Sequence, residues 1–375
     1  MCGYILRGVA FVVRGRLLQA DGLRYLEGVT ELATEPRIRA QRLRALVVAV
    51  ASIFPVALPA QQLNGAGASF PNPIYSRWFS EYARLHPGVQ INYQAVGSGA
   101  GIRQASQGIV DFGASDTPMT DDQMRAAKVK LFHIPTVLGA VVPTYHLPGV
   151  TAELKFSGDV IADIYLGRIT QWRDPRLAAL NPGVALPDHD ILPVYRSDGS
   201  GTTFIFTDFL AKNSPEFLSR IGRNTSVRWK LGIGQKGNEG VAGMVRNTPY
   251  SFGYVELIYA EQNHMAFGSV RNRAGRFVRA SPDSVSAAAQ SLAATMPNDF
   301  RVSVTNPPGA DAYPIASLTW LLVPVQSPDP AKGRILQEFL RWMLRSGEGE
   351  ADALSYAPLP PTIAHKVAGA IEYLR

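Results

Sequence analysis

Residues 195–203 combine a fixed cation, two glycines and several hydroxyl side chains in the order Tyr-Arg-Ser-Asp-Gly-Ser-Gly-Thr-Thr. They join an apolar strand, expected over Ile191 to Val194, to a helix expected to begin near Gly201. Backbone N–H groups at a helix N-terminus point at a bound anion, and glycine lets an oxygen atom approach the main chain. Arg196 can add a forked pair of charged hydrogen bonds. This segment therefore predicts an anion-binding site.

Two earlier segments have the same design, a strand end followed by a Gly/Ser-rich turn and a helix start. The first is Gly-Ala-Gly-Ala-Ser-Phe-Pro at 65–71, in which Pro71 suits the first helical turn and Ser69 is a natural cap. The second is Gly-Ser-Gly-Ala-Gly at 97–101, which lacks the full G-x-G-x-x-G spacing of a dinucleotide site. Taken alone, either turn is also typical of an ordinary capped helix.

A further segment, Val-Asp-Phe-Gly-Ala-Ser-Asp-Thr-Pro-Met at 110–119, ends its strand on an acid, Asp116, rather than on a donor. By itself, an aspartate shortly before Pro118 is typical of a solvated turn. The segment at 196–203 can likewise be a helix cap with a surface arginine. All four turns follow predicted strands, however, and open α/β sheets bind ligands at the carboxyl ends of strands. Together they favour one site for a small oxyanion.

Asp116 is the residue expected to select among oxyanions. An ionised carboxylate only accepts hydrogen bonds, so an anion that lies beside it must bring a proton. Phosphate carries a proton at neutral pH, whereas sulfate does not. A sulfate oxygen facing Asp116 would meet charge repulsion and an unmet acceptor, at a cost on the order of several kcal/mol. We therefore expect phosphate to be preferred over sulfate.

From Leu63 onward, short apolar strands alternate with amphipathic helices, which predicts an α/β fold with a mostly parallel sheet and helices on both faces. A strand is expected to begin at Leu63, and further strands are expected at 89–96, 110–114, 191–194, 252–255 and 318–325. Helices are expected over 73–85 and 333–344, from 101, from 201 and after the glycine-rich turn at 232–240. The apolar run 132–142 is expected to be interrupted at Pro135 and Gly139. A polar segment is expected to extend to about Asp311.

The first sixty residues have the pattern of a leader. The hydrophobic run from Ala45 to Leu58 is preceded by four arginines and followed by Pro-Ala, and it is shorter than the roughly twenty residues of a membrane-spanning helix. It is typical of a secretory signal peptide cleaved between Ala60 and Gln61. Residues 1–36 exceed the charged region of such a peptide. Two interpretations are possible. Either the given start lies upstream of the true one, for which Val29 is a candidate, or residues 1–36 form a small structured extension.

Composition and charge bear on the number of domains, on nucleic-acid binding and on a lipid anchor. The chain has 375 residues and is 46% apolar, which is enough for a large core and for two domains. The leader holds eight arginines and four acids, so its +4 leaves +3 of the formal net charge of +7. The remainder has no Lys/Arg block interleaved with aromatic residues, so nucleic-acid binding is not expected. The single cysteine, Cys2, has no apolar segment before it, which disfavours a lipid anchor.

From Asn64 to about Ile363 the sequence resembles the periplasmic phosphate-binding proteins of phosphate-specific ABC transporters. The resemblance is carried by the segments at 65–71 and 110–116 and by Asp-Ile-Tyr-Leu-Gly at 163–167, Asp-Gly-Ser-Gly-Thr at 198–202 and Phe-Gly-Tyr-Val-Glu at 252–256. Ordered motifs over 300 residues are far more specific than any single glycine turn.

The resemblance implies a hinged, two-lobed periplasmic binding protein fold of the type II kind, which closes on inorganic phosphate and delivers it to the transmembrane permease subunits of an ABC transporter. Lobe I would comprise 61–138 plus 312–375 and lobe II 139–311, with crossings near Gly139 and within 311–315. The resemblance also implies a binding protein without catalysis, cofactor or metal. The expected signal peptide and the position of Cys2 predict a free, soluble periplasmic protein, which we expect to be monomeric.

Carried over position by position, the resemblance implies a set of phosphate ligands. From lobe I, Ser69 and Phe70 would donate backbone N–H groups, Ser98 would donate its N–H and hydroxyl, and Asp116 would accept the proton of the ligand. From lobe II, Arg196, Ser200, Gly201 and Thr202 would donate, and Asp198 would orient Arg196. Gly99 and Ala100 stand where a hydroxyl residue and a glycine are often seen.

Two alternatives remain open at this point. A hydrolase of phosphate esters could use a serine, an arginine and an aspartate, but the sequence lacks G-x-S-x-G, the P-loop pattern and H-E-x-x-H. The six histidines show no metal-ligand spacing, and Asp-His-Asp at 188–190 is more typical of a polar loop. A binder of sulfate or molybdate is the second alternative, and Asp116 discriminates against it.

Overall fold

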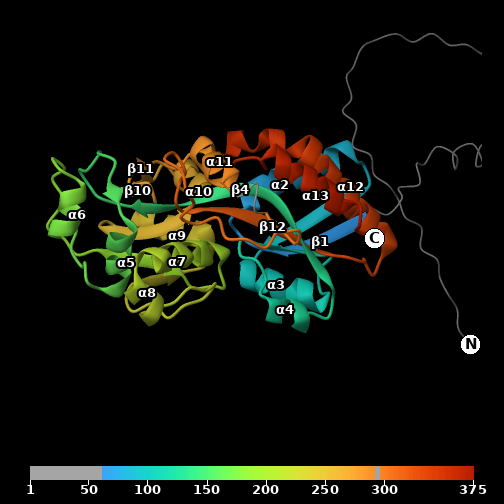
Figure 1. Ribbon diagram of the computed structural model, residues 1–375, viewed down its shortest axis with the longest axis horizontal. Coiled ribbons are helices and arrows are strands. Elements are labelled where there is room, and N and C mark those ends of the chain that lie inside the picture. Colours follow the sequence, from blue (N-terminus) through green and yellow to red (C-terminus); the bar gives the residue numbers. More distant parts are fainter. Residues whose placement is uncertain (1–60, 292–295) are drawn as a thin grey trace, which may run out of the picture. The chain divides into compact units, whose positions relative to one another are not determined.

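The structure is a computed structural model that describes residues 61–291 and 296–375. The expected leader, with Ala60, Val29 and Cys2, lies outside these residues. The described part is an α/β structure with helices on both faces of a central sheet (Figure 1). In these ranges, no helix has both the length and the apolar character that crossing a bilayer requires.

The structure defines the bounds of each element. The strands are β1 (Gln61–Gly67), β2 (Val89–Ala95), β3 (Phe112–Ser115), β4 (Leu131–Tyr145), β5 (Lys155–Phe156), β6 (Leu192–Arg196), β7 (Ile233–Gln235), β8 (Ser251–Glu256), β9 (Ala266–Phe267), β10 (Ser269–Arg271), β11 (Phe277–Val278) and β12 (Ala316–Pro324). The helices are α2 (Asn72–Leu85), α3 (Ser98–Gln107), α4 (Asp121–Ala126), α5 (Gly158–Leu166), α6 (Pro175–Leu180), α7 (Gly201–Asn213), α8 (Pro215–Arg220), α9 (Gly237–Asn247), α10 (Leu257–Gln262), α11 (Pro282–Gln290), α12 (Pro330–Arg345) and α13 (Pro361–Ile371), with 3-10 turns η1 (Gly347–Glu350) and η2 (Asp352–Leu354). The segment expected to be a polar connection up to Asp311 contains three short strands and two helices.

The main sheet is mixed. Within the described residues its strand order is β2-β1-β3-β12-β4-β8-β6-β7, with β9 paired to β4, and a small separate sheet has the order β11-β10-β5. Parallel ladders lie at the two ends, where β1 pairs with β2 and β3 and where β6 pairs with β7 and β8. In the centre, β4 and β12 run antiparallel to their neighbours. The fold class is therefore as predicted.

The long strand β4 connects the two ends of the sheet. Its first part, through Ala140, pairs with β12, and its second part, from Val141, pairs with β8. The predicted interruption at Pro135 and Gly139 is wrong, because β4 continues through both residues. The register shifts beside Pro135, because Thr319 is paired with Val137 and Trp320 with Pro135, which leaves Thr136 of β4 as an extra, bulged residue. Bulges are a usual place for a proline in a sheet.

The parallel strands form two groups, the first of β1, β2 and β3 and the second of β6, β7 and β8. The ladder directions bring the carboxyl ends of both groups to the middle of β4. Ser115, the last residue of β3, is paired with Trp320, which in turn is paired with Pro135. Glu256, the last residue of β8, is paired with Val141. Because β3 runs in the same direction as β4 and β8 runs in the opposite direction, both groups end toward residues 135–141. Turns that follow strands of either group therefore meet there.

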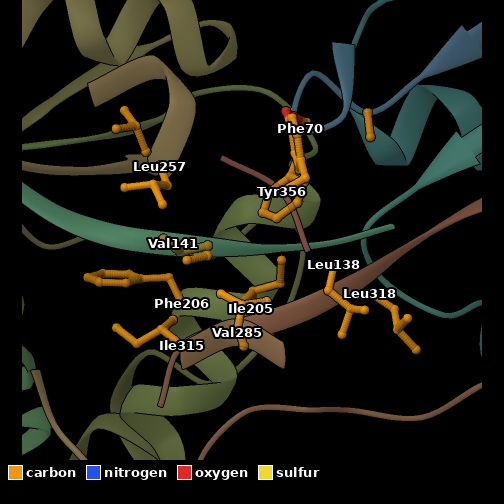
Figure 2. Close-up of a cluster of buried hydrophobic side chains, with 14 of the residues drawn as sticks. Phe70, Leu138, Val141, Ile205, Phe206, Leu257, Val285, Ile315, Leu318 and Tyr356 are labelled. Atoms are coloured by element: carbon orange, nitrogen blue, oxygen red, sulfur yellow. The ribbon is translucent and has the colours of Figure 1, made fainter. Parts of the chain in front are cut away.

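The apolar core extends under both parts of the sheet. Figure 2 shows one cluster of buried side chains that come from β4, α7, α10, α11 and β12. At its edge the rings of Phe70 and Tyr356 lie 6.3 Å apart, and the Tyr356 hydroxyl donates to the Phe70 carbonyl at 2.6 Å. Gly139 is required beside them, since a Cβ there would lie 2.6 Å from the Phe70 ring.

One buried histidine should make stability depend on pH. His133 on β4 is 1% exposed, and its Nε2 accepts the Met119 N–H at 3.0 Å. Burial, with help from the nearby Arg301 charge, lowers the pKa of His133 from 6.5 to about 4. A neutral folded-state histidine that must be protonated on unfolding contributes stability above pH 6.5, and this contribution is lost as the pH falls toward 4.

We predict that the free energy of unfolding of the unchanged chain falls by about 2 kcal/mol more than that of His133→Gln between pH 7 and pH 5. Glutamine is not titrated but keeps an acceptor for Met119. Urea unfolding of both proteins at the two pH values measures this difference. Other titrating groups are the same in the two proteins, so their effects cancel in the comparison. The same pH dependence in both proteins would contradict the assignment.

Candidate functional site

Three predicted residues from different turns share one hydrogen-bonded junction. Ser98 begins α3, Asp116 follows β3 and Gly201 begins α7. The Ser98 hydroxyl oxygen accepts the N–H groups of Asp116 at 3.2 Å and Gly201 at 3.1 Å, and the hydroxyl donates to Asp116 Oδ2 at 3.3 Å. The structure therefore places residues from both parts of the sheet against each other, as the predicted site requires.

The approach of the two sides requires glycine at the contact. A Cβ at Gly201 would lie 2.4 Å from Ser98 Oγ and 2.6 Å from Asp116. At Gly97, where φ is +92°, a Cβ would lie 2.4 Å from Asp198 Oδ2. Gly97 also lets α3 begin at Ser98, three residues before the predicted start at 101.

Arg196 is held by a forked ion pair at the end of β6. Its Nε and Nη2 donate to the two carboxylate oxygens of Asp198 at 2.8 and 2.7 Å, and its Nη1 donates to Thr202 Oγ1 at 3.2 Å. The Arg196 side chain is only 1% exposed. Burial opposes ionisation of Asp198, but the hydrogen bonds and charge of Arg196 outweigh burial and hold the pKa of Asp198 below its usual value. The Gly237 N–H also donates to Asp198.

The turn after β1 is fixed through its carbonyl groups. Tyr259 donates to the Ser69 carbonyl at 2.7 Å, and Tyr356 donates to the Phe70 carbonyl. The expectation that Ser69 caps α2 is wrong, because this helix begins after Pro71 without a side-chain cap. The Ser69 hydroxyl oxygen instead accepts from Asn238, on the other side of the site.

Several buried backbone donors point to a ligand of negative charge. Among the described residues, the N–H groups of Ser69, Phe70, Ser98 and Thr202 meet no hydrogen-bond acceptor of the protein, although all four residues are buried. Ser200 has a different role. Its N–H donates to the Thr225 carbonyl, and its hydroxyl oxygen caps α7 by accepting the Thr203 N–H. Buried N–H groups are nearly always paired, so a cluster of free ones is typical of an anion site.

Asp116 is the acceptor among these donors. It is 1% exposed, and its Oδ1 accepts from the Thr319 hydroxyl at 2.7 Å. Burial raises the pKa of Asp116 to about 7, against the opposing effects of the Thr319 bond, the Arg196 charge and the Ser98 bond. The expectation that this carboxyl is fully ionised at neutral pH therefore needs correction, because desolvation disfavours the charge.

Tyr259, Tyr356, Asn238 and Thr319 contact the predicted ligand residues without having been predicted, and the last two do so through polar contacts with the side chains of those residues. Asn238 is buried at the start of α9 and donates to both Ser69 and Thr202. Its only signal in the sequence is its place in the predicted glycine-rich turn at 232–240. Thr319, inside the apolar strand β12, had no signal at all, since its partner Asp116 is 203 residues away.

The one segment whose residue types could suggest a metal site is Asp-His-Asp at 188–190. In the part of the chain that the structure describes, no three His, Cys, Asp or Glu side chains are grouped to hold a metal ion. In the Asp-His-Asp segment, Asp188 pairs with Arg173, and the His189 ring stacks on Tyr250 with centroids 3.8 Å apart. These contacts fit the polar loop that the sequence predicted.

Comparison with known proteins gives a family. A family model described as the PBP superfamily domain matches residues 55–347. The chain is 42% identical over 326 residues to the phosphate-binding protein PstS of Pasteurella multocida (strain Pm70), covering 86% of this chain and 94% of that protein. It is 41% identical over 307 residues to the phosphate-binding protein PstS of Xylella fastidiosa (strain Temecula1), covering 82% of this chain and 84% of that protein.

A solved structure agrees on the fold. The X-ray structure of a phosphate-binding protein from Stenotrophomonas maltophilia superposes with a TM-score of 0.64 at 21% identity, covering 83% of this chain and 94% of that one. The resemblance seen in the sequence motifs is thus confirmed over most of the chain. The chain belongs to the PstS family of phosphate-binding proteins, within the PBP superfamily.

Proposed function

We propose that the chain binds inorganic phosphate at the junction of Ser98, Asp116 and Gly201 and delivers it to the permease subunits of a phosphate ABC transporter. The observation that carries this proposal is the convergence of buried donors from three turns around the buried carboxyl group of the fourth, Asp116. The names of the Pasteurella and Xylella relatives support phosphate as the ligand. The role is binding and release, without catalysis.

The proposed ligands divide into donors and one acceptor. Ser69, Phe70, Ser98 and Thr202 would donate through backbone N–H or hydroxyl groups, Ser200 would donate its hydroxyl, and Arg196 would donate through its guanidinium. Gly201 would donate its N–H to phosphate by releasing the Ser98 hydroxyl oxygen, which accepts that N–H at 3.1 Å in the structure. Asp116 would share one proton with the phosphate, whichever of the two carries it before binding. Such sharing needs a ligand or a carboxyl that brings the proton, and phosphate brings one across the neutral range.

The domain boundaries are part of the proposal. Lobe I would comprise 61–138 plus 312–375 and lobe II 139–311. The change of partner along β4, from β12 to β8 between Ala140 and Val141, supports a hinge there. We infer a monomeric periplasmic protein whose closed lobes are recognised by the permease, and the expected signal peptide supports the location.

Calorimetric titration of the purified chain with phosphate and with a phosphate monoester tests this function. We expect one phosphate bound per chain, and no phosphate released from the monoester over hours. Release of phosphate from the monoester would instead favour a hydrolase. Absence of phosphate binding would contradict the proposal.

Replacement of Asp116 should weaken the discrimination against sulfate. Asparagine keeps an acceptor for Thr319 and adds an amide donor that can face an unprotonated oxygen. We predict that the ratio of phosphate to sulfate affinity falls at least about tenfold in Asp116→Asn at pH 8. Asp111→Asn makes the same charge change outside the proposed site and serves as the control. An unchanged ratio in Asp116→Asn would remove the carboxyl from this role.

The pKa of Asp116 predicts how sulfate binding varies with pH. A protonated carboxyl can donate to sulfate, and its population rises about tenfold from pH 8 to pH 6 when the pKa is about 7. We therefore predict that sulfate binds the unchanged chain about tenfold more tightly at pH 6 than at pH 8, and that Asp116→Asn shows no such change. Competition titrations against phosphate measure both. Equal sulfate affinity at the two pH values would contradict the assignment.

Removal of the Arg196 guanidinium should cost about 1.5–3 kcal/mol of phosphate binding free energy, because charged hydrogen bonds are lost from a buried site. That cost corresponds to roughly a 10- to 100-fold weaker Kd in Arg196→Ala. Arg173→Ala, which removes an exposed arginine paired with Asp188, provides the matched control. Unchanged affinity in Arg196→Ala would exclude this residue from the site.

A further inference from the structure

Asn238 is a buried polar residue that the proposed ligand set leaves without a role. It is the second residue of α9 and is 0% exposed. Its side-chain Nδ2 lies within hydrogen-bond distance of two hydroxyl groups from different parts of the chain, Ser69 Oγ at 3.1 Å and Thr202 Oγ1 at 3.2 Å. Both hydroxyls belong to the proposed site, and they come from its opposite sides.

A contact with the backbone of β8 fixes the orientation of the Asn238 amide. Its Oδ1 accepts the backbone N–H of Glu256 at 3.1 Å, at the carboxyl end of β8. Since an N–H must face an acceptor, the carbonyl of the amide has to face Glu256. The Nδ2 group is therefore directed at the two hydroxyls as a donor.

This orientation determines where the hydroxyl protons point. Thr202 Oγ1 accepts from Arg196 Nη1 at 3.2 Å and from Asn238 Nδ2, so both of its lone pairs are used. Ser69 Oγ likewise accepts from the Asn238 N–H at 3.3 Å and from Nδ2. An oxygen that accepts two hydrogen bonds can act only as a donor through its own proton.

We propose that Asn238 is a positioning residue that makes Ser69 and Thr202 committed hydrogen-bond donors toward the bound anion. The inference rests on the proposed phosphate function and adds a residue outside the predicted set. Asn238 also connects the two sides of the site. It lies in α9, between β7 and β8, and its amide contacts Ser69 in the turn after β1. It can do so only when the lobes are closed, so its contribution belongs to the closed complex.

Two substitutions separate this role from simple packing. Asn238→Leu has a similar volume but no donor or acceptor. Asn238→Asp keeps the acceptor for Glu256 but replaces the donor Nδ2 with an oxygen that attracts the Ser69 and Thr202 protons away from the ligand. We expect Kd for phosphate to rise about tenfold in the leucine variant and about 100-fold in the aspartate variant. The charge of the aspartate also repels the anion, so the leucine variant and the mutant cycle decide between positioning and packing.

A mutant cycle tests whether Asn238 acts through the two hydroxyls. In a chain that carries Ser69→Ala and Thr202→Val, the hydroxyls are gone, and we expect Asn238→Leu to weaken phosphate binding less than about threefold. In the otherwise unchanged chain, the roughly tenfold loss should lie mainly in a faster dissociation rate, because Asn238 bridges the sides after closure. Stopped-flow measurement of both rate constants and thermal unfolding of each variant complete the set.

The outcomes distinguish this inference from the proposed function. If the unchanged chain does not bind phosphate, the proposed function fails and this inference fails with it. If it binds, but Asn238→Leu costs the same tenfold with and without the hydroxyls, only the inference is overturned. The inference is also overturned if Asn238→Asp binds phosphate more tightly than Asn238→Leu.

Discussion

The site depends on a carboxyl group held out of water among donors. Asp116 is 1% exposed, and burying such a group unpaired is costly, so its surroundings must supply hydrogen bonds from every side. Thr319 and Ser98 supply two of these bonds, and Arg196 adds a favourable charge. These effects together still leave the pKa of Asp116 near 7. The proposed phosphate would complete the arrangement, because a protonated oxyanion can satisfy the acceptor and the free N–H groups together.

This constraint explains several features of the fold. The donors can reach the carboxyl only if the carboxyl ends of β3 and β8 face each other, which the antiparallel centre of the sheet ensures. The contact then has no room for side chains at Gly97 and Gly201. Because β4 is the continuous strand that both parts share, its change of partner between Ala140 and Val141 is where we propose that the lobes bend relative to each other.

The turns and many of the site residues could be predicted from the sequence, because the features that mark them are local. Arg196, Asp198 and Thr202 act within a few residues of one another, so a local motif is enough to identify them. Strand ends, glycines and helix starts are also local features, which is why the four turns were found. The motifs that carry the family resemblance contain most of these residues, and the comparisons confirmed that resemblance.

The missed features depend on distant partners. Asn238 lies 169 residues from Ser69, and Thr319 lies 203 residues from Asp116, so no local pattern marks either one. Ser69 has the residue type of a helix cap, but its tertiary partner Asn238 determines its role. Pro135 suggested a strand break, whereas a bulge formed with β12 accommodates it. The protonation of Asp116 depends on burial, which only the folded chain shows.

The measurement that tests the central claim most directly is a crystal structure of the chain grown with phosphate at pH 8. The account predicts one phosphate with an oxygen within hydrogen-bond distance of the Asp116 carboxyl, and other oxygens within reach of Arg196, Thr202 and the N–H groups of Ser69 and Phe70. A phosphate bound elsewhere, or one at this site with no oxygen near Asp116, would contradict the account.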